Sequence, residues 1–374
     1  MSINPRLVKE SLACLEPVAD QAMAYLYGRL FAAVPGLRAL FPPAMNAQRE
    51  LLFQAITRVA WTLDSPDGLA ARLKRLGRAH RKYGVLPEHY PAFGEALLAT
   101  VRRFAAEVWT PETEAAWVSA CTTAIELMSE GARADDGPAW WPAEVVDHDI
   151  RTPDIAVITL RPAQELPFRA GQYVEVQTPR WPRVWRAYSI ANAPRPDGTV
   201  RLHVRTVPGG WVSTALTRHT RVGDTLLLGP PSGGVPLPDG EHDILAVADD
   251  TGLAPLKAII EHVIASGLRP RVCLVHGART AAELYDIPDL VRMQSAWPWL
   301  RVVPVVSDQQ GYEGERGTPP DVLPRLGSWR DHVAYVCGPS PMVEATVRVL
   351  QQEGVPPERI HRPGMPSDSW DAYP

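Results

Sequence analysis

Three patterns of hydrophobic and polar positions follow one another along the 374 residues. Over residues 1–135, apolar side chains recur every three or four positions, as at Met23, Leu26 and Leu30, which predicts amphipathic helices. Prolines and an SPDG stretch interrupt the pattern, so we expect about six or seven helices with short connections. This segment should therefore form an all-α domain.

The pattern changes twice after this segment. Residues 139–238 contain short runs with alternating apolar and polar residues, such as 173–177 and 200–206, which predict antiparallel strands closed into a β-barrel. Residues 241–366 instead alternate continuous apolar runs with helical segments, the pattern of an α/β domain built on a parallel sheet. The expected fold is multidomain, with an irregular tail at 367–374.

Composition narrows the classes of function. The 38 basic and 42 acidic side chains give a net charge of -4 without a basic block, so nucleic acid is not an expected partner. The four cysteines are far apart, which argues against a disulfide framework or a thiolate zinc site. The N-terminus lacks a signal-peptide core, and no apolar run reaches the ~20 residues that span a bilayer. We expect a cytoplasmic protein without a membrane partner.

A histidine in the helical segment is the first candidate for chemistry. His80 lies on a predicted helix face with Leu73 and Leu76, where a ring nitrogen could bind iron. A lone helical histidine is more often a surface or core residue than a ligand. Four other side chains would line a pocket with it, and these are Tyr27, Phe41, Gln48 and Leu52.

The motifs YGRLF, LRALFPP and QRELLF, together with LPEHY after His80, resemble the globin domain of flavohaemoglobins over its whole length. The resemblance implies haem b with His80 as the proximal iron ligand. It makes Tyr27 and Gln48 distal hydrogen-bond donors, and it implies that Leu52 is a distal gate and Phe41 a haem-packing ring.

On the proximal side, Tyr90 matches the tyrosine that in the family acts with a glutamate on the proximal histidine. Counting from Trp117, that glutamate would fall near 132–134, whereas this chain has Glu126 and Glu130 about one turn earlier. The alternative reading of these two glutamates is a solvated helix face.

The second candidate site combines a strand with a glycine turn. Alone, an arginine, tyrosine and serine at this spacing could belong to an ordinary strand, but the turn after them could present backbone amides to a phosphate. The pair resembles the flavin domain of ferredoxin reductases and implies FAD. The implied flavin residues are Tyr173, Arg186, Tyr188, Ser189, Gly209, Gly210, Val212, Ser213 and Thr214.

The third candidate site departs from the family pattern. The family's nucleotide domain opens with a turn of the type AGGTGxAP, and here Asp249 and Asp250 replace two small residues. The resemblance implies that NAD(P)H binds at this turn. Because carboxylates there should repel a pyrophosphate, the identity of the electron donor stays open. The matching positions are Thr251, Gly252, Pro255, Cys337, Gly338 and Pro339, and HGART around Arg279 matches a further motif.

The C-terminus departs as well, because Met365 stands where the family places an aromatic residue against the flavin. Trp370 or Tyr373 could substitute for it, and an irregular tail is the alternative.

The resemblance implies a monomeric nitric oxide dioxygenase that passes electrons from NAD(P)H through FAD to haem and oxidises nitric oxide with dioxygen to nitrate. One alternative is a divergent flavohaemoglobin that takes electrons from D-lactate or another donor. Another is a haem-based gas or redox sensor or carrier. A flavin reductase without haem would leave the globin motifs unexplained.

Overall fold

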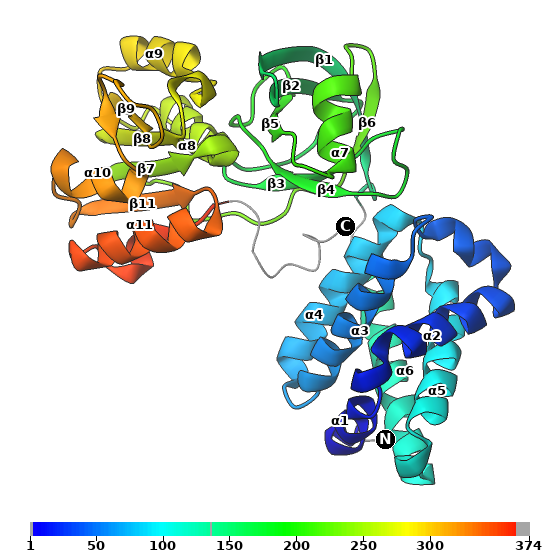
Figure 1. Cartoon of the computed structure of the whole chain (residues 1–374). Coiled ribbons are helices and arrows are strands. Elements are labelled where there is room, and N and C mark those ends of the chain that lie inside the picture. Colours follow the sequence, from blue (N-terminus) through cyan, green and yellow to red (C-terminus); the bar gives the residue numbers. More distant parts are fainter. Residues whose placement is uncertain (1–2, 135–136, 364–374) are drawn as a thin grey trace. The chain divides into compact units, whose positions relative to one another are not determined.

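The computed structural model describes residues 3–134 and 137–363, and the chain separates into two compact units. One unit holds the residues up to Ala139, and the other holds most of the chain from Trp140 onward. Figure 1 shows helices in the first unit and two separate sheets in the second. The expected combination of an all-α domain, an antiparallel β domain and a parallel α/β domain is confirmed.

The first unit is helical, as the spacing of apolar residues predicted. Its α-helices are α1 (Pro5–Ala13), α2 (Ala19–Ala33), α3 (Asn46–Trp61), α4 (Pro66–His80), α5 (Tyr90–Phe104) and α6 (Pro111–Arg133). Short 3₁₀ turns connect them, namely η1 (Glu16–Val18), η2 (Pro35–Leu40), η3 (Arg81–Tyr83), η4 (Pro87–His89) and η5 (Ala106–Val108). Proline occupies the first position of α1, α4 and α6, where its missing N–H costs nothing.

Helices α4 and α6 cross in backbone contact. A Cβ added at Gly77 on α4 would lie 1.9 Å from the carbonyl oxygen of Met128, and one added at Gly131 on α6 would lie 2.0 Å from that of Lys74. Only glycine permits this approach. The crossing fixes the last turn of α4, which ends at His80.

The first sheet of the second unit is antiparallel. Its strands are β1 (Trp141–Thr152), β2 (Ile155–Pro162), β3 (Tyr173–Gln177), β4 (Arg186–Ser189), β5 (Val200–Arg205) and β6 (Thr225–Leu228), in the order β4-β3-β6-β1-β2-β5. A bridge between Ile190, just beyond β4, and Leu202 on β5 joins the two edges of this sheet, which closes it into a barrel. The helical turns α7 (Trp211–Thr214) and η6 (Ala215–His219) follow β5.

The second sheet is parallel. Its strands are β7 (Asp243–Asp249), β8 (Val272–Ala278), β9 (Leu300–Val306), β10 (Glu315–Arg316), β11 (His332–Cys337) and β12 (Ile360–His361), in the order β10-β9-β8-β7-β11-β12. Core residues of α8 (Leu253–Ala265) and α9 (Ile287–Ala296) cover one face, and those of α10 (Pro319–Leu326) and α11 (Ser340–Gln352) cover the other. The remaining turns are η7 (Asp250–Gly252), η8 (Ala281–Glu283) and η9 (Pro357–Arg359).

The strand order reverses direction at β7, because β8 lies on one side of it and β11 on the other. In open α/β sheets, ligands bind beyond the carboxyl ends of the strands at such a switch point. Asp249 ends β7 and Cys337 ends β11, so both lie at this edge.

None of the helices in residues 3–134 and 137–363 is long and apolar enough to cross a membrane.

Candidate functional site

The predicted distal residues of the helical unit lie together around Tyr27 on α2. The Tyr27 ring makes an edge contact with Phe41, at 5.3 Å between ring centroids, and stacks on Phe31 at 5.6 Å. Burial raises the pKa of the Tyr27 hydroxyl, and a hydrogen-bonding interaction with the Gln48 side chain acts in the opposite direction. At neutral pH the phenol is therefore protonated and can donate a hydrogen bond.

Hydrogen bonds from Arg38 fix the backbone at Phe41. The Arg38 guanidinium donates to the carbonyl oxygens of Phe41, Pro42 and Pro43, at 3.2, 3.0 and 2.9 Å. It also lies over the Phe31 ring. This fixes the turn between η2 and α3, and with it the edge of the aromatic cluster.

The predicted proximal residue, His80, ends α4. Its Nδ1 atom is buried and has no hydrogen-bond partner among the described residues. Burial, with a smaller effect of Lys82, lowers the pKa of His80 to about 4, so the ring is neutral at physiological pH, as an iron ligand requires. The Tyr90 ring lies 6.2 Å from the His80 ring, and burial raises the pKa of the Tyr90 hydroxyl to about 12.

Neither candidate glutamate reaches His80. Glu126 and Glu130 both have exposed side chains on α6. Glu130 forms an ion pair with Lys74, at 2.5 Å between Nζ and Oε1. These two residues behave as a solvated helix face, and within residues 3–134 and 137–363 no carboxylate is hydrogen-bonded to the His80 ring.

The residues between Tyr27 and His80 fit a haem. Leu52 and Phe41 belong to the core cluster of this unit, yet they are only partly buried. The same holds for further apolar side chains of that cluster, including Phe53, Leu76, Val85 and Phe93. A planar apolar group bound to His80 would complete their burial, and a neutral imidazole with a buried second nitrogen matches the iron ligand expected.

The predicted flavin residues lie on two paired strands of the barrel. Tyr173 on β3 pairs with Ser189 on β4, and Val176 pairs with Arg186. Strand alternation therefore puts Arg186 and Tyr188 on one face, while Tyr173 and Ser189 share the other. Burial raises the pKa of Tyr188, so its hydroxyl remains a neutral donor. Arg186 donates to the carbonyl oxygen of Trp185 at 2.8 Å.

The glycine turn after β5 is tied together by Ser213. The Ser213 hydroxyl accepts a hydrogen bond from the Val207 N–H and donates to the Gly210 carbonyl, both at 3.2 Å. Gly209 has φ +73°, and a Cβ at Gly210 would lie 2.4 Å from the Val207 side chain. The turn therefore requires both glycines. It leads into α7, which contains Val212 and Thr214.

The nucleotide turn follows β7. Asp250 has φ +55°, a left-handed conformation that glycine adopts without strain. Its carboxylate pairs with the Arg205 guanidinium at the end of β5, at 2.6 Å, and Arg205 also pairs with Asp154 at 2.6 Å. An arginine from the barrel thus compensates one of the two unexpected carboxylates.

The other carboxylate is more crowded. Burial, and next the charge of Asp250, raise the pKa of Asp249 to about 6. The Asp249 side chain lies against Gly277 and Gly338, since a Cβ at Gly277 would be 2.7 Å from its Oδ1 and one at Gly338 would be 3.1 Å from its Cβ. Asp249 therefore occupies the edge of the sheet where a nucleotide would bind.

The remaining predicted nucleotide residues surround this turn. Thr251 and Gly252 lie in η7, and Pro255 lies in the first turn of α8. A Cβ at Gly252 would be 2.3 Å from the carbonyl oxygen of Cys337, so the turn packs directly on the end of β11. Burial raises the pKa of the Cys337 thiol to about 12, which keeps it protonated.

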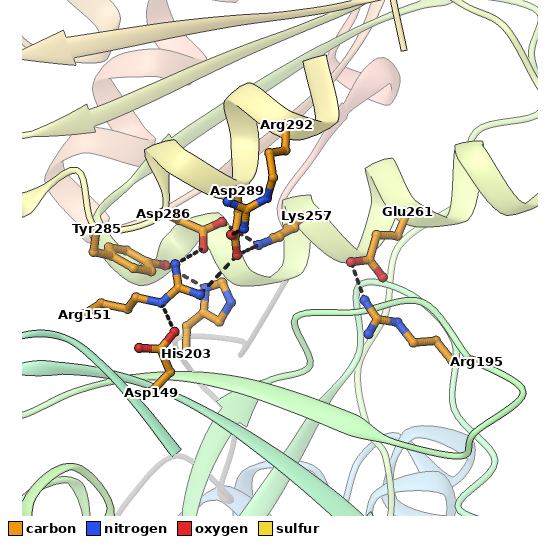
Figure 2. Close-up of polar contacts among 10 residues, drawn as sticks. All are labelled: Asp149, Arg151, Arg195, His203, Lys257, Glu261, Tyr285, Asp286, Asp289 and Arg292. Atoms are coloured by element: carbon orange, nitrogen blue, oxygen red, sulfur yellow. Dashed lines mark hydrogen bonds and ion pairs between the residues drawn. The ribbon is translucent and has the colours of Figure 1, made fainter. Parts of the chain in front are cut away.

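A buried ion-pair network joins the barrel to the parallel-sheet domain (Figure 2). Lys257 on α8 donates to Asp286 at 2.6 Å, and Arg151 on β1 pairs with Asp289 at 3.1 Å. The His203 ring contacts the Tyr285 hydroxyl at 2.7 Å. These contacts fix the barrel against α8 and α9, beside the Arg205–Asp250 pair.

The C-terminal residues Met365, Trp370 and Tyr373 lie outside the described residues, so the predicted flavin contact at this end stays a prediction.

Comparison with known proteins places these sites in a family. The Globin family model matches residues 24–128, the oxidoreductase FAD-binding domain 142–236 and the oxidoreductase NAD-binding domain 247–348. A flavohemoprotein of Bordetella pertussis is 30% identical over 388 residues, which cover 95% of this chain and 96% of that protein. The chain belongs to the flavohaemoprotein family. The haem, FAD and NAD expected from the sequence are those of its three domains.

Two further relatives of this flavohaemoprotein frame the comparison. The crystal structure of a flavohemoglobin from Malassezia yamatoensis with bound FAD and heme has a TM-score of 0.72 at 18% identity, and the match covers 95% of this chain and 98% of that one. The reductase subunit of an aromatic O-demethylase from Amycolatopsis is 36% identical over 219 residues, which are 56% of this chain and 64% of that protein.

Sequence reasoning missed three residues of the flavohaemoprotein's sites. Phe31 follows Tyr27 by four positions, so helical spacing would have placed the two rings together. Arg205 and Asp154 belong to the barrel, and no local pattern links them to a turn 45 or more positions away. The two aspartates in the turn did signal that a cation must be near.

Proposed function

We propose that this flavohaemoprotein is a nitric oxide dioxygenase that uses NAD(P)H. The observation that carries the proposal is the neutral Tyr27 hydroxyl beside Gln48 in the helical unit of a chain that also contains FAD- and NAD-binding oxidoreductase domains. Nitric oxide and dioxygen combine to nitrate with one electron supplied, so an attached reductase lets the cycle repeat. Haem and FAD, when bound, supply the oxygen and electron chemistry.

The chain's own residues orient and polarise the reactants. His80 would hold the haem iron, and Tyr27 would donate a hydrogen bond that favours negative charge on the bound ligand. Gln48 orients the Tyr27 hydroxyl, while Phe41 and Leu52 exclude water. In the barrel, Arg186 and Ser189 would bind and orient FAD, and the Tyr188 ring would pack against it.

The reaction is tested with a nitric oxide electrode on the protein loaded with haem and FAD, under air, with NADH, NADPH or D-lactate as donor. We expect consumption that continues until the nicotinamide donor is exhausted, with nitrate as the product. Tyr27→Phe should slow it, because the bound ligand loses its donor. The control Tyr25→Phe should not, because this half-buried tyrosine of the same helix packs against Phe104 and not against the Tyr27 cluster. If the protein consumed only one equivalent of nitric oxide, turnover would be refuted. If D-lactate alone supported consumption, D-lactate would replace NAD(P)H as the proposed electron donor.

A second function has one specific observation in its favour. His80 Nδ1 has no acceptor in the part of the chain that the structure describes, so the ring would donate less electron density to a bound iron than an imidazole hydrogen-bonded to carboxylate. That environment suits a gas carrier or sensor, which binds its ligand without rapid turnover. The iron–histidine stretching frequency in the resonance Raman spectrum of the ferrous protein distinguishes the two, because a carboxylate acceptor raises it.

The expectation of a monomer in the cytoplasm accompanies the proposal. The scattered cysteines support the cytoplasmic location, and the absence of a basic block in the sequence argues against a nucleic-acid partner.

A further inference from the structure

The nucleotide turn contains two negative charges at a site that must accept an anion. Its backbone is otherwise suited to phosphate: η7 leads into the 13-residue helix α8, and N–H groups at a helix start attract anions. Gly252 and Gly277 keep Cβ atoms away from this edge, because each added Cβ would lie within 2.5 Å of a neighbour. The carboxylates of Asp249 and Asp250 are the obstacle.

Arg205 already sits where a phosphate would need a cation. Its Nε donates to Asp250 at 2.7 Å, and its Nη1 donates to Asp154 at 2.6 Å. A guanidinium N–H group that donates to a carboxylate oxygen can donate to a phosphate oxygen instead. The Asp250 carboxylate thus stands in the free protein at a position that a phosphate oxygen can take.

Asp249 forms no ion pair with any described residue, and the charge of Arg205 offsets its acidic neighbours only in part. The charged groups that face it are Asp250 from η7, Arg205 from β5 and Glu283 from η8, so two of the three are acidic. Arg279 is committed to Glu283, and the buried His276 on β8 is neutral. The neighbouring Cys337 thiol on β11 is protonated.

We propose that Arg205 is the phosphate-binding residue of this turn, held by Asp250 and Asp154 until nucleotide arrives, and that Asp249 must take up a proton when the anionic nucleotide binds. The inference deepens the proposed NAD(P)H-dependent function and rests on it. It assigns to Asp249 and Arg205 the control of nucleotide affinity, and it makes that affinity depend on pH.

The direction of the pH dependence follows from linkage. A bound anion disfavours the charged form of Asp249, so its pKa in the complex lies above the value of about 6 in the free protein. Between these two values a proton is taken up on binding. The association constant therefore levels off below about pH 6 and falls by up to tenfold per pH unit above it.

The test is calorimetric titration of oxidised NAD⁺ into the haem- and FAD-loaded full chain, from pH 5.5 to 8.5, in two buffers with different heats of ionisation. NAD⁺ binds without turnover, and the buffer dependence of the heat counts protons. We expect uptake approaching one proton at pH 7.5. Asp249→Asn should bind more tightly at that pH, with little pH dependence left. The control Asp243→Asn, at the opposite end of β7, should keep the dependence of the unmodified protein.

Arg205 is tested at pH 5.5, where Asp249 is mostly protonated. Arg205→Gln should weaken NAD⁺ binding by roughly ten- to a hundredfold, the range for a lost charge-assisted hydrogen bond. Arg205→Lys should recover part of the loss, which a purely structural role in the turn would not predict. Flavin fluorescence of each variant shows whether the barrel has folded.

Three outcomes would overturn the proposal. The first is a pH dependence that persists in Asp249→Asn. The second is undiminished binding by Arg205→Gln, and the third is failure of both the unmodified protein and Asp249→Asn to bind NAD⁺ at pH 5.5. If NADH drove nitric oxide turnover but NAD⁺ binding did not depend on pH, this inference would be wrong and the proposed function would be unaffected.

Discussion

Removing Lys257 should strongly destabilise the second unit. The Lys257 ammonium is 3% exposed and donates to Asp286, which is fully buried, so each charge depends on the other. Lys257→Met keeps most of the apolar stem but leaves Asp286 with the Arg151 guanidinium 3.6 Å away as its ion-pair partner. Breaking a buried pair by deleting one partner costs about 3–5 kcal/mol, because the remaining charge is stranded.

The assay is urea unfolding of the full chain, followed by flavin fluorescence so that only the second unit is observed. The double variant Lys257→Met/Asp286→Leu should regain much of the loss, because no charge is then left unpaired. The control is Arg271→Met, whose side chain is 85% exposed and pairs with Asp243 at the surface. That change should cost less than about 1 kcal/mol. If Lys257→Met cost no more than Arg271→Met, the network would have no structural role.

Three further predictions concern other parts of the molecule. Tyr27→Phe should raise the dioxygen dissociation rate about tenfold, the equivalent of one hydrogen bond of ~1.5 kcal/mol, in stopped-flow measurements. Gly77→Ala should destabilise the helical unit by at least ~1–3 kcal/mol, because its Cβ would meet a carbonyl oxygen at 1.9 Å; the measurement is unfolding followed by the haem Soret band. The control Gly28→Ala, whose Cβ would have nothing within 4 Å, should stabilise α2 by up to ~1 kcal/mol. Burial lowers the pKa of His276 to about 4. Its neutral form therefore stabilises the fold fully above pH 6.5, and this contribution is lost as the pH falls, by up to ~1.4 kcal/mol per pH unit. His276→Leu should remove this loss from a plot of unfolding free energy against pH.

Local periodicity predicted the class of each of the three domains, since apolar spacing of three or four residues and strict alternation reflect which face is buried. Prolines and the SPDG stretch were expected to interrupt the helical pattern, and the structure places Pro66 and Pro111 at the first positions of α4 and α6, where the N–H has no partner to lose. Strands were also expected around Tyr173 and Ser189, and the structure adds that these two residues pair across β3 and β4.

Contacts between distant segments could not be predicted in this way. The crossing of α4 and α6 depends on Gly77 and Gly131, which read in sequence only as weak helix formers. The Arg205–Asp250 pair joins two sheets, and no local sequence pattern distinguishes Arg205 from the other arginines as the partner of Asp250. Burial, which shifts the pKa of Asp249, is likewise a property of the assembled edge and not of the turn sequence.

Two departures from the family pattern bear on different steps of one cycle. In the proposed function, the lack of an acceptor for His80 Nδ1 among the described residues would affect how strongly iron donates electrons to its ligand. The carboxylates at 249–250 would affect how readily nucleotide binds beside the flavin. The effect at His80 should be independent of nucleotide concentration. The effect of the two carboxylates should weaken as the pH falls towards 6 or as the nucleotide concentration rises. Flavin reduction and nitric oxide consumption, measured separately across pH, therefore assign a slow turnover to one half of the chain or to the other.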